Sequence, residues 1–248
     1  MNGMVEKHRL VEIFRELSRA GNRVKHAVAA SLPLLACALA WAAPGICHGE
    51  DRGQSADWAL SDPQLQRVEA GAVIAEGDVA PDKPIVDIRA AIKIAASPEQ
   101  VFRTLTDCAR ALRFVPHLKR CAVLESAPDG RWQNVEQTVD YGWLVPRKSY
   151  VFHAEYEKFT RIRFSNLRGE FRENRGVWTF RPLDDGRATV VTYEARIAPA
   201  FYVPRWMMRN MLKRDLPDLL RGLKSHAEAV RSAAATNVMG SAPVPPDP

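Results

Sequence analysis

The chain has 248 residues, of which 46% are hydrophobic and 26% are charged, a balance typical of one globular domain or two small ones. Its formal net charge is +6, but half of that excess lies in the first 49 residues, and the remainder carries 29 Lys and Arg against 26 Asp and Glu. A surplus this small argues against nucleic-acid binding.

The N-terminus has the organisation of a secretory signal. Residues 27–43 carry no charge, and basic residues precede them. A basic segment followed by an apolar stretch and small residues is typical of a signal peptide. Residues 1–49 are therefore predicted to be one, with cleavage between Ala40 and Glu50, which gives a periplasmic or secreted protein. The alternative is an uncleaved N-terminal membrane anchor, although a run of seventeen apolar residues interrupted by Pro33 is short for a membrane span.

Residues 50–84 are predicted to form a polar N-terminal extension. Asp62 and Pro63 begin a short helix, because proline favours the first helical position. Residues 72–76 follow as a short strand, and a proline-containing connector leads to the main domain.

The main domain begins with a strand at 85–95, where Ile and Val alternate with charged residues. Ser97 and Pro98 predict the N-cap and first residue of a helix, and a second, shorter helix is expected to end before Pro116. The hydrophobic period then changes to two, and short turns separate six further strands. These strands are predicted at about 119–127, 131–142, 147–158, 160–167, 170–182 and 187–198.

Residues 205–232 are predicted to form a long amphipathic helix, because apolar residues recur at three- and four-residue steps. Pro217 is expected to kink or split this helix near Asp215. Residues 233–248 are predicted to be a disordered tail, which leaves 85–232 as the domain. This order of elements predicts an α+β fold in which a curved antiparallel sheet of six to seven strands wraps around the C-terminal helix.

Two cysteines lie inside the domain, Cys108 and Cys121. In an oxidising compartment, two cysteines that flank a loop at this spacing predict a disulfide. The alternative is a pair of buried free thiols.

The order of elements and several short motifs resemble the START-like (SRPBCC) superfamily. The motifs are residues 92–102 (IKIAASPEQVF), 113–116 (RFVP), 178–180 (WTF) and 192–195 (TYEA). Within the superfamily the chain is most similar to the polyketide cyclase/dehydrase and coenzyme Q-binding START-domain branch, over about residues 85–230. The resemblance implies a helix-grip fold. It also implies a function among those of the family, which includes lipid carriers, quinone-binding chaperones, hormone receptors and a few cyclases.

No metal or nucleophile motif is visible in the sequence. His117, His153 and His226 are isolated and have no partner at ligand spacing. There is also no glycine-rich loop of the kind that binds phosphate. No catalytic residue, metal or cofactor is therefore predicted.

The aromatic residues give the clearest indication of a binding site, because alternation places large rings on one face of successive strands. If these faces point toward the final helix, they line an apolar site with a few polar anchors, the usual form of a small-molecule pocket. Methionines at the start of the final helix suit the mouth of such a site. The alternative is an ordinary hydrophobic core. The predicted ligand-binding residues are Val139, Tyr141, Phe152, Phe164, Trp178, Tyr193, Met208 and Met211.

These observations predict an exported binding or carrier protein for an apolar ligand such as a lipid, an acyl chain or a quinone. One alternative is a cyclase- or hydrolase-like enzyme that uses a pocket tyrosine with Gln137 or Asn166. Another is a domain that serves only a protein partner. The predicted partner is a small apolar ligand and not nucleic acid; a transient membrane contact and the oligomeric state are left open.

Overall fold

The structure, a computed structural model, describes residues 58–79, 85–143 and 145–239, with side chains as far as Ser232. The predicted signal peptide and the end of the predicted tail lie outside the described residues. Within the described part of the chain, no helix combines the length and the apolar character needed to cross a bilayer.

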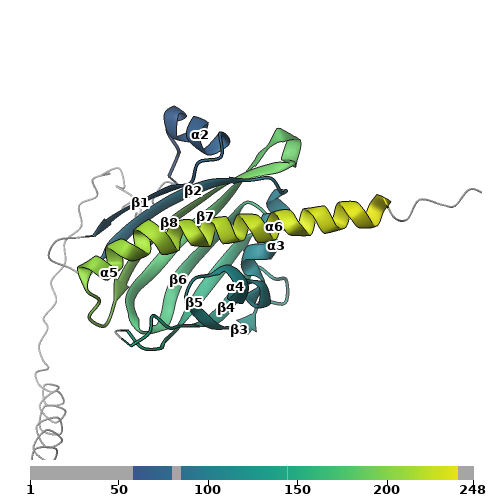
Figure 1. The fold of residues 1–248 in the computed structure, drawn as a ribbon. Helices are drawn as coiled ribbons and strands as arrows, with labels where there is room; N and C mark the ends of the chain where they lie inside the picture. The colour runs from purple at the N-terminus through teal and green to yellow at the C-terminus, as the bar shows by residue number, and fades with distance from the viewer. Residues whose placement is uncertain (1–57, 80–84, 144, 240–248) are drawn as a thin grey trace, which may run out of the picture. The chain divides into compact units, whose positions relative to one another are not determined.

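In the described residues, eight strands form one antiparallel sheet in the order β1-β2-β8-β7-β6-β5-β4-β3 (Figure 1). Short turns join the strands from β3 to β8, so each of these strands pairs with its sequence neighbour. The strands are β1 (Ile74–Val79), β2 (Val86–Ile94), β3 (Leu118–Ser126), β4 (Trp132–Val139), β5 (Lys148–Glu157), β6 (Arg161–Gly169), β7 (Phe171–Leu183) and β8 (Ala188–Pro199).

The predicted α+β helix-grip architecture is confirmed, but the predicted count of six to seven strands is wrong by one edge strand. β1 is the strand expected at 72–76, in the N-terminal extension, and it pairs with β2 through Gly77 opposite Ile88. Only Ile74 of β1 is buried, so the strand lacks the apolar alternation that marks a core strand. Backbone hydrogen bonds to β2, rather than side-chain burial, place it in the sheet.

Two short helices connect β2 to β3. α3 (Pro98–Thr106) begins with a capping box, in which the Ser97 hydroxyl accepts a hydrogen bond from the Gln100 backbone N–H. The Asp107 carboxylate accepts hydrogen bonds from the first backbone N–H groups of α4 (Cys108–Phe114). A further short helix, α2 (Asp62–Glu69), packs Val68 against β1 and β2.

The C-terminal helix has three parts: α5 (Arg205–Asn210), a π-helical turn η3 (Met211–Asp215) and α6 (Leu216–Met239). Pro217 lacks the N–H that would bond back into the preceding turn, and the helix widens there. The sequence predicted a kink or split in this helix near Asp215. The observed π-helical turn ends at that residue. η3 packs on β1, where Gly77 leaves room for the Leu212 side chain.

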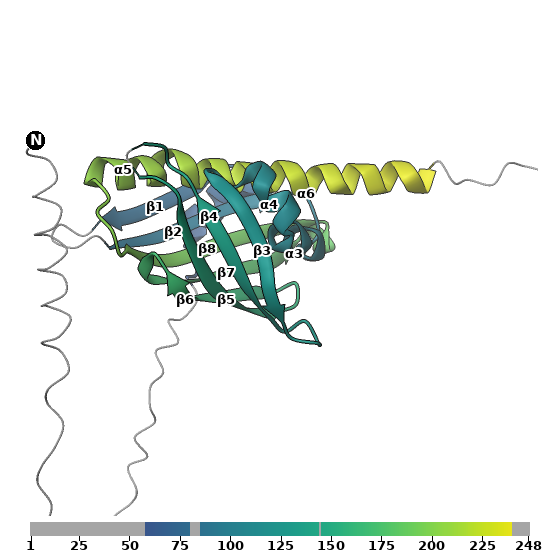
Figure 2. The ribbon, with the colours of Figure 1, turned by 90° about the horizontal axis from the view of Figure 1, so that it is seen from below.

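The main core lies between α6 and one half of the sheet (Figures 1 and 2). Ile92 and Ile94 of β2 and Leu220 and Leu223 of α6 are all at most 1% exposed. The main packing contacts of α6 are with α3, α4, β1 and β2. The inner face of the strands farther from β2 is therefore covered less directly by the helix.

Candidate functional site

A continuous row of aromatic rings crosses the inner face of the sheet from β7 and β8 through β6 to β5, and it ends at the first residue of β7. Successive ring centroids lie 4.1, 6.2, 6.1, 6.2 and 4.8 Å apart. Stacked and edge-to-face pairs at such distances stabilise one another beyond simple burial. We call this row the aromatic belt; its members, in order, are Trp178, Tyr193, Phe164, Phe152, Tyr150 and Phe171.

The belt changes from fully to partly buried along its length. Trp178 and Tyr193 are buried in the same cluster as Leu216 and Leu220, so this end belongs to the main core. The rings from Phe164 onward keep part of their surface exposed. A large ring that faces inward and is still accessible can contact a ligand without displacing the core.

The structure brings together only part of the predicted ligand-binding set. Phe152, Phe164, Trp178 and Tyr193 lie in the belt. Val139 lies beneath α4 with Ala111 and Leu118, and Met208 packs with Val145 and Val203 in a separate cluster. Tyr141 contacts both of these clusters, and Met211 is half-buried in η3.

Three tyrosines lie close enough to influence one another's ionisation: Tyr193 and Tyr150 in the belt, and Tyr141 beside it. Burial raises the pKa of Tyr141, Tyr150 and Tyr193, and the nearby Tyr150 contributes to the rise for the other two. The hydroxyls therefore stay protonated and act as hydrogen-bond donors. Tyr150 donates to Gln137 Oε1 at 2.7 Å. In the described structure the hydroxyls of Tyr141 and Tyr193 make no hydrogen bond, which leaves them available to a ligand.

A buried acceptor lies on the strand next to Phe152 of the belt. Asn166 in β6 pairs with Phe152 of β5 and donates from Nδ2 to the Phe171 carbonyl oxygen at 3.0 Å. Its Oδ1 is buried and has no hydrogen-bond partner among the described residues. An unsatisfied buried acceptor is costly, and a polar group of a ligand would relieve that cost.

An acid–base pair that the sequence did not predict lies near Tyr141. His117 Nε2 is 3.4 Å from an oxygen of Asp215, and the His117 ring lies 4.3 Å from that of Tyr141, centroid to centroid. Burial raises the pKa of the Asp215 carboxyl, and the neighbouring His117 opposes the rise. Neither residue has a partner at short sequence spacing, so the isolated His117 gave no signal of this pair.

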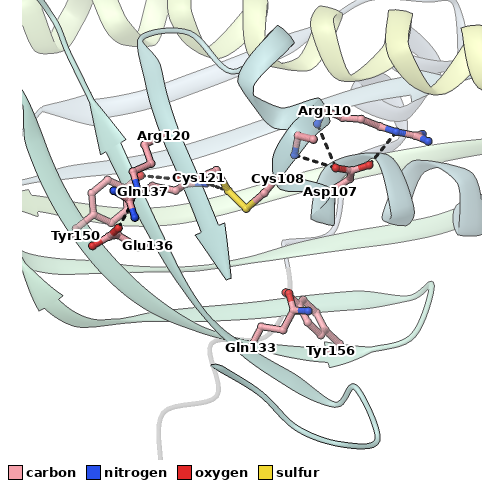
Figure 3. The surroundings of a disulfide bond; sticks show 11 residues. Asp107, Cys108, Arg110, Arg120, Cys121, Gln133, Glu136, Gln137, Tyr150 and Tyr156 are labelled. Carbon is pink, nitrogen blue, oxygen red and sulfur yellow. Dashed lines mark hydrogen bonds and ion pairs between the residues drawn. A yellow bond between two sulfur atoms is a disulfide. The ribbon is translucent and has the colours of Figure 1, made fainter. Parts of the chain in front are cut away.

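The two domain cysteines lie beside the same polar end. Cys108 in α4 and Cys121 in β3 have their Cα atoms 5.2 Å apart and their sulfurs at bonding distance (Figure 3). Gln137 donates weakly to Cys121 Sγ at 3.9 Å while it accepts from Tyr150. A bond here would tie α4 to the strand next to Gln137 and so hold the polar groups in place.

The described residues contain no group of three or more His, Cys, Asp or Glu that could hold a metal ion. An open hollow of about 1250 Å³ lies along β6, β7, β8 and β2, but charged side chains dominate its lining. Two of its arginines are ion-paired there, Arg89 with Glu194 and Arg196 with Asp87. The hollow reaches the belt at Phe164, but its charged lining does not suit an apolar molecule.

A curved antiparallel sheet that grips one long helix defines the helix-grip class of START-like proteins. The sequence matches the family described as polyketide cyclase / dehydrase and lipid transport over residues 94–224, more than half of the chain. The chain belongs to this family, which confirms the resemblance seen in its motifs.

Solved structures show the same fold. The STAR-related lipid transfer protein (fragment 25–204) from Xanthomonas axonopodis has a TM-score of 0.54 at 20% identity, over 63% of this chain and 93% of that one. A START superfamily protein from Mycobacterium smegmatis has a TM-score of 0.50 at 19% identity, over 58% and 98%. Human STARD10 has a TM-score of 0.54 at 10% identity, over 76% and 88%. A comparison with curated protein sequences gives no match.

Proposed function

We propose that this domain binds an elongated apolar molecule that carries a polar group at one end, such as a lipid, an acyl chain or a quinone. The aromatic belt contacts the apolar part. The free hydroxyls of Tyr141 and Tyr193 and the buried Asn166 Oδ1 bind the polar group. The observation that carries this proposal is the buried, unpartnered Oδ1 of Asn166, which lies on the strand next to the partly buried Phe152 ring.

The energetics favour an apolar ligand. Covering a few hundred Å² of ring surface stabilises a complex by several kcal/mol at roughly 25 cal/mol per Å², before the loss of ligand freedom is subtracted. The family description includes lipid transport, and the Xanthomonas relative is a STAR-related lipid transfer protein. Both support the ligand class.

Native mass spectrometry of the protein purified from cells tests this function. We expect a co-purifying apolar molecule in the wild type and none in Trp178→Glu, because a charge at that position disrupts the belt. Arg181→Glu, on the exposed face of the same strand, is the matched control and should retain the ligand. Because Trp178→Glu also strains the core, Asn166→Leu provides a milder variant: it should retain apolar molecules but lose preference for the polar end. Ligand-free wild type that also fails to bind added fatty acids or quinones would contradict the proposal.

We also propose that the protein is exported, with cleavage between Ala40 and Glu50, and that the Cys108–Cys121 bond forms in that compartment. The uncharged run at 27–43 after basic residues supports export. N-terminal sequencing of the processed protein tests it. A product that starts near Met1 and sediments with membranes would favour the anchor instead.

A cyclase-like enzyme is the second candidate, and the His117–Asp215 pair next to the Tyr141 ring favours it. A histidine beside a carboxylate can move a proton to or from a bound substrate. If the domain is an enzyme, Asp215→Asn should abolish turnover of a poly-β-ketone substrate while leaving its binding unchanged. Equal turnover in wild type and Asp215→Asn would exclude a catalytic role for this pair.

A further inference from the structure

Exposed aromatic side chains gather at the end of the molecule where the C-terminal helix begins. Trp143 in the β4–β5 loop is 92% exposed, Tyr202 after β8 is 84% exposed, and Trp206 in α5 is 64% exposed. Their neighbours Val145, Val203 and Met207 pack together in one buried cluster, which fixes the two segments side by side (Figure 2).

The segment that carries Tyr202 and Trp206 has charges of one sign only. Residues 197–214 contain four Lys and Arg and no Asp or Glu, whereas the domain as a whole, residues 85–232, mixes 26 Lys and Arg with 17 Asp and Glu. Trp206, Arg209 and Lys213 are spaced so that they share one exposed face of the helix. Arg205, Arg209, Lys213 and Arg214 make no ion pair with any described residue. Many arginines on the sheet, in contrast, are paired.

We infer that this end of the molecule docks on the surface of an anionic phospholipid bilayer. We call it the docking face; it consists of Trp143, Tyr202, Arg205, Trp206, Arg209 and Lys213. Trp and Tyr side chains favour the boundary between headgroups and acyl chains, and clustered cations bind anionic headgroups. The combination fits a lipid surface better than a protein partner, because Trp206 shares its helix with unpaired cations and residues 197–214 contain no acid.

The position of the docking face gives it a role beyond ligand binding itself. α5 continues into η3, which carries the half-buried Met211 and the Asp215 that contacts His117. A bilayer that holds α5 therefore lies next to the widened turn at the polar end of the site. Contact there would let an apolar molecule pass between bilayer and domain without crossing water.

Co-sedimentation with vesicles tests the inference. Wild-type protein should bind vesicles of phosphatidylcholine with 30% phosphatidylglycerol at least about tenfold more tightly than pure phosphatidylcholine vesicles, and salt should weaken this binding. The double variants Arg205→Glu/Arg209→Glu and Trp143→Ala/Trp206→Ala should each lower the affinity at least about tenfold. Arg181→Glu and Leu124→Ala, which alter exposed side chains elsewhere, should bind as the wild type does. All proteins carry the same N-terminal residues, so differences among them report on the docking face.

A local readout separates this face from any other membrane contact. Vesicles with brominated acyl chains should quench the tryptophan fluorescence of the wild type, and Trp143→Phe/Trp206→Phe should lose most of that quenching. Unchanged binding and quenching in the docking-face variants would overturn the inference. So would a wild type that is dimeric in solution and becomes monomeric in Trp143→Ala/Trp206→Ala, since the face would then bind a second copy.

Discussion

The two halves of the sheet differ in how their inner faces are filled. Around β2 and α6, side chains such as Ile92 and Leu220 are almost completely buried and purely apolar. Around β5 and β6, the inner face carries half-buried rings, the Tyr150 hydroxyl and an unsatisfied amide oxygen. The first half therefore forms a stable hydrophobic core. The second half has accessible ring surface and a hydrogen-bond acceptor without a partner, which a ligand could use. Stability and binding should therefore respond to different substitutions.

The largest loss of stability is expected from Leu220→Ala. Leu220 is fully buried between α6 and the sheet, and removing such a side chain leaves a cavity that lowers the free energy of unfolding by about 2–5 kcal/mol. Urea denaturation measures this change. The folded variant should retain its ligand affinity; a parallel loss of affinity would show that the two halves are not separable.

Next in size is removal of the cysteine pair. In the chain-entropy model, a bond closing a loop of this length stabilises by about 3 kcal/mol, so Cys108→Ser/Cys121→Ser should lose that much. Wild type under reducing conditions should match the double variant. Two titratable thiols in the native exported protein would show that the bond does not form.

A substitution in the belt should affect ligand binding more than stability. Phe164→Ala removes a ring that is only partly buried, so the free energy of unfolding should fall by about 1–2 kcal/mol, less than for a fully buried phenylalanine. Ligand affinity should fall by about tenfold, because the ring contacts the apolar part of the ligand. Fluorescence titration with a labelled fatty acid measures the affinity. Tighter or unchanged binding would remove Phe164 from the site.

A smaller effect on stability is expected in the π-helical turn. Met211 is half-buried, so Met211→Phe should change the free energy of unfolding by about 1 kcal/mol or less while reducing ligand uptake. The buried Met207 provides the matched control, since Met207→Phe overpacks its cluster and should cost about 1–3 kcal/mol. Uptake at the wild-type rate in Met211→Phe would place the mouth elsewhere.

The smallest expected effect concerns Asp215 and pH. Burial raises the pKa of this carboxyl above its ordinary value of 3.8, so the folded state holds a proton that the unfolded state has released. Its contribution to the free energy of unfolding therefore decreases as pH rises from 3.8 through the raised pKa. Asp215→Asn should lack this decrease, whereas Asp218→Asn, which removes a negative charge that adds to the raised pKa of Asp215, should show a smaller decrease than the wild type. Chemical denaturation at a series of pH values measures the difference, and parallel curves for Asp215→Asn and wild type would contradict it.

The sequence by itself determined the elements of the domain and their order. Alternation in the strands, the Ser97–Pro98 helix start and the apolar stripe of the last helix are local patterns, and each follows from backbone periodicity and capping. The same alternation predicted which rings face inward. Four of those predicted residues, Phe152, Phe164, Trp178 and Tyr193, lie in the belt.

Tertiary structure alone decided which polar groups meet. His117 follows α4 and Asp215 lies in the widened turn, so their contact depends on how α6 crosses the sheet. β1 joined the sheet through backbone pairing that leaves no apolar pattern in its sequence. Val139 and Met208 were also predicted to face inward, but each packs in a cluster outside the belt. The periodicity of a strand or helix predicts which face a side chain occupies, but not which other elements it contacts there.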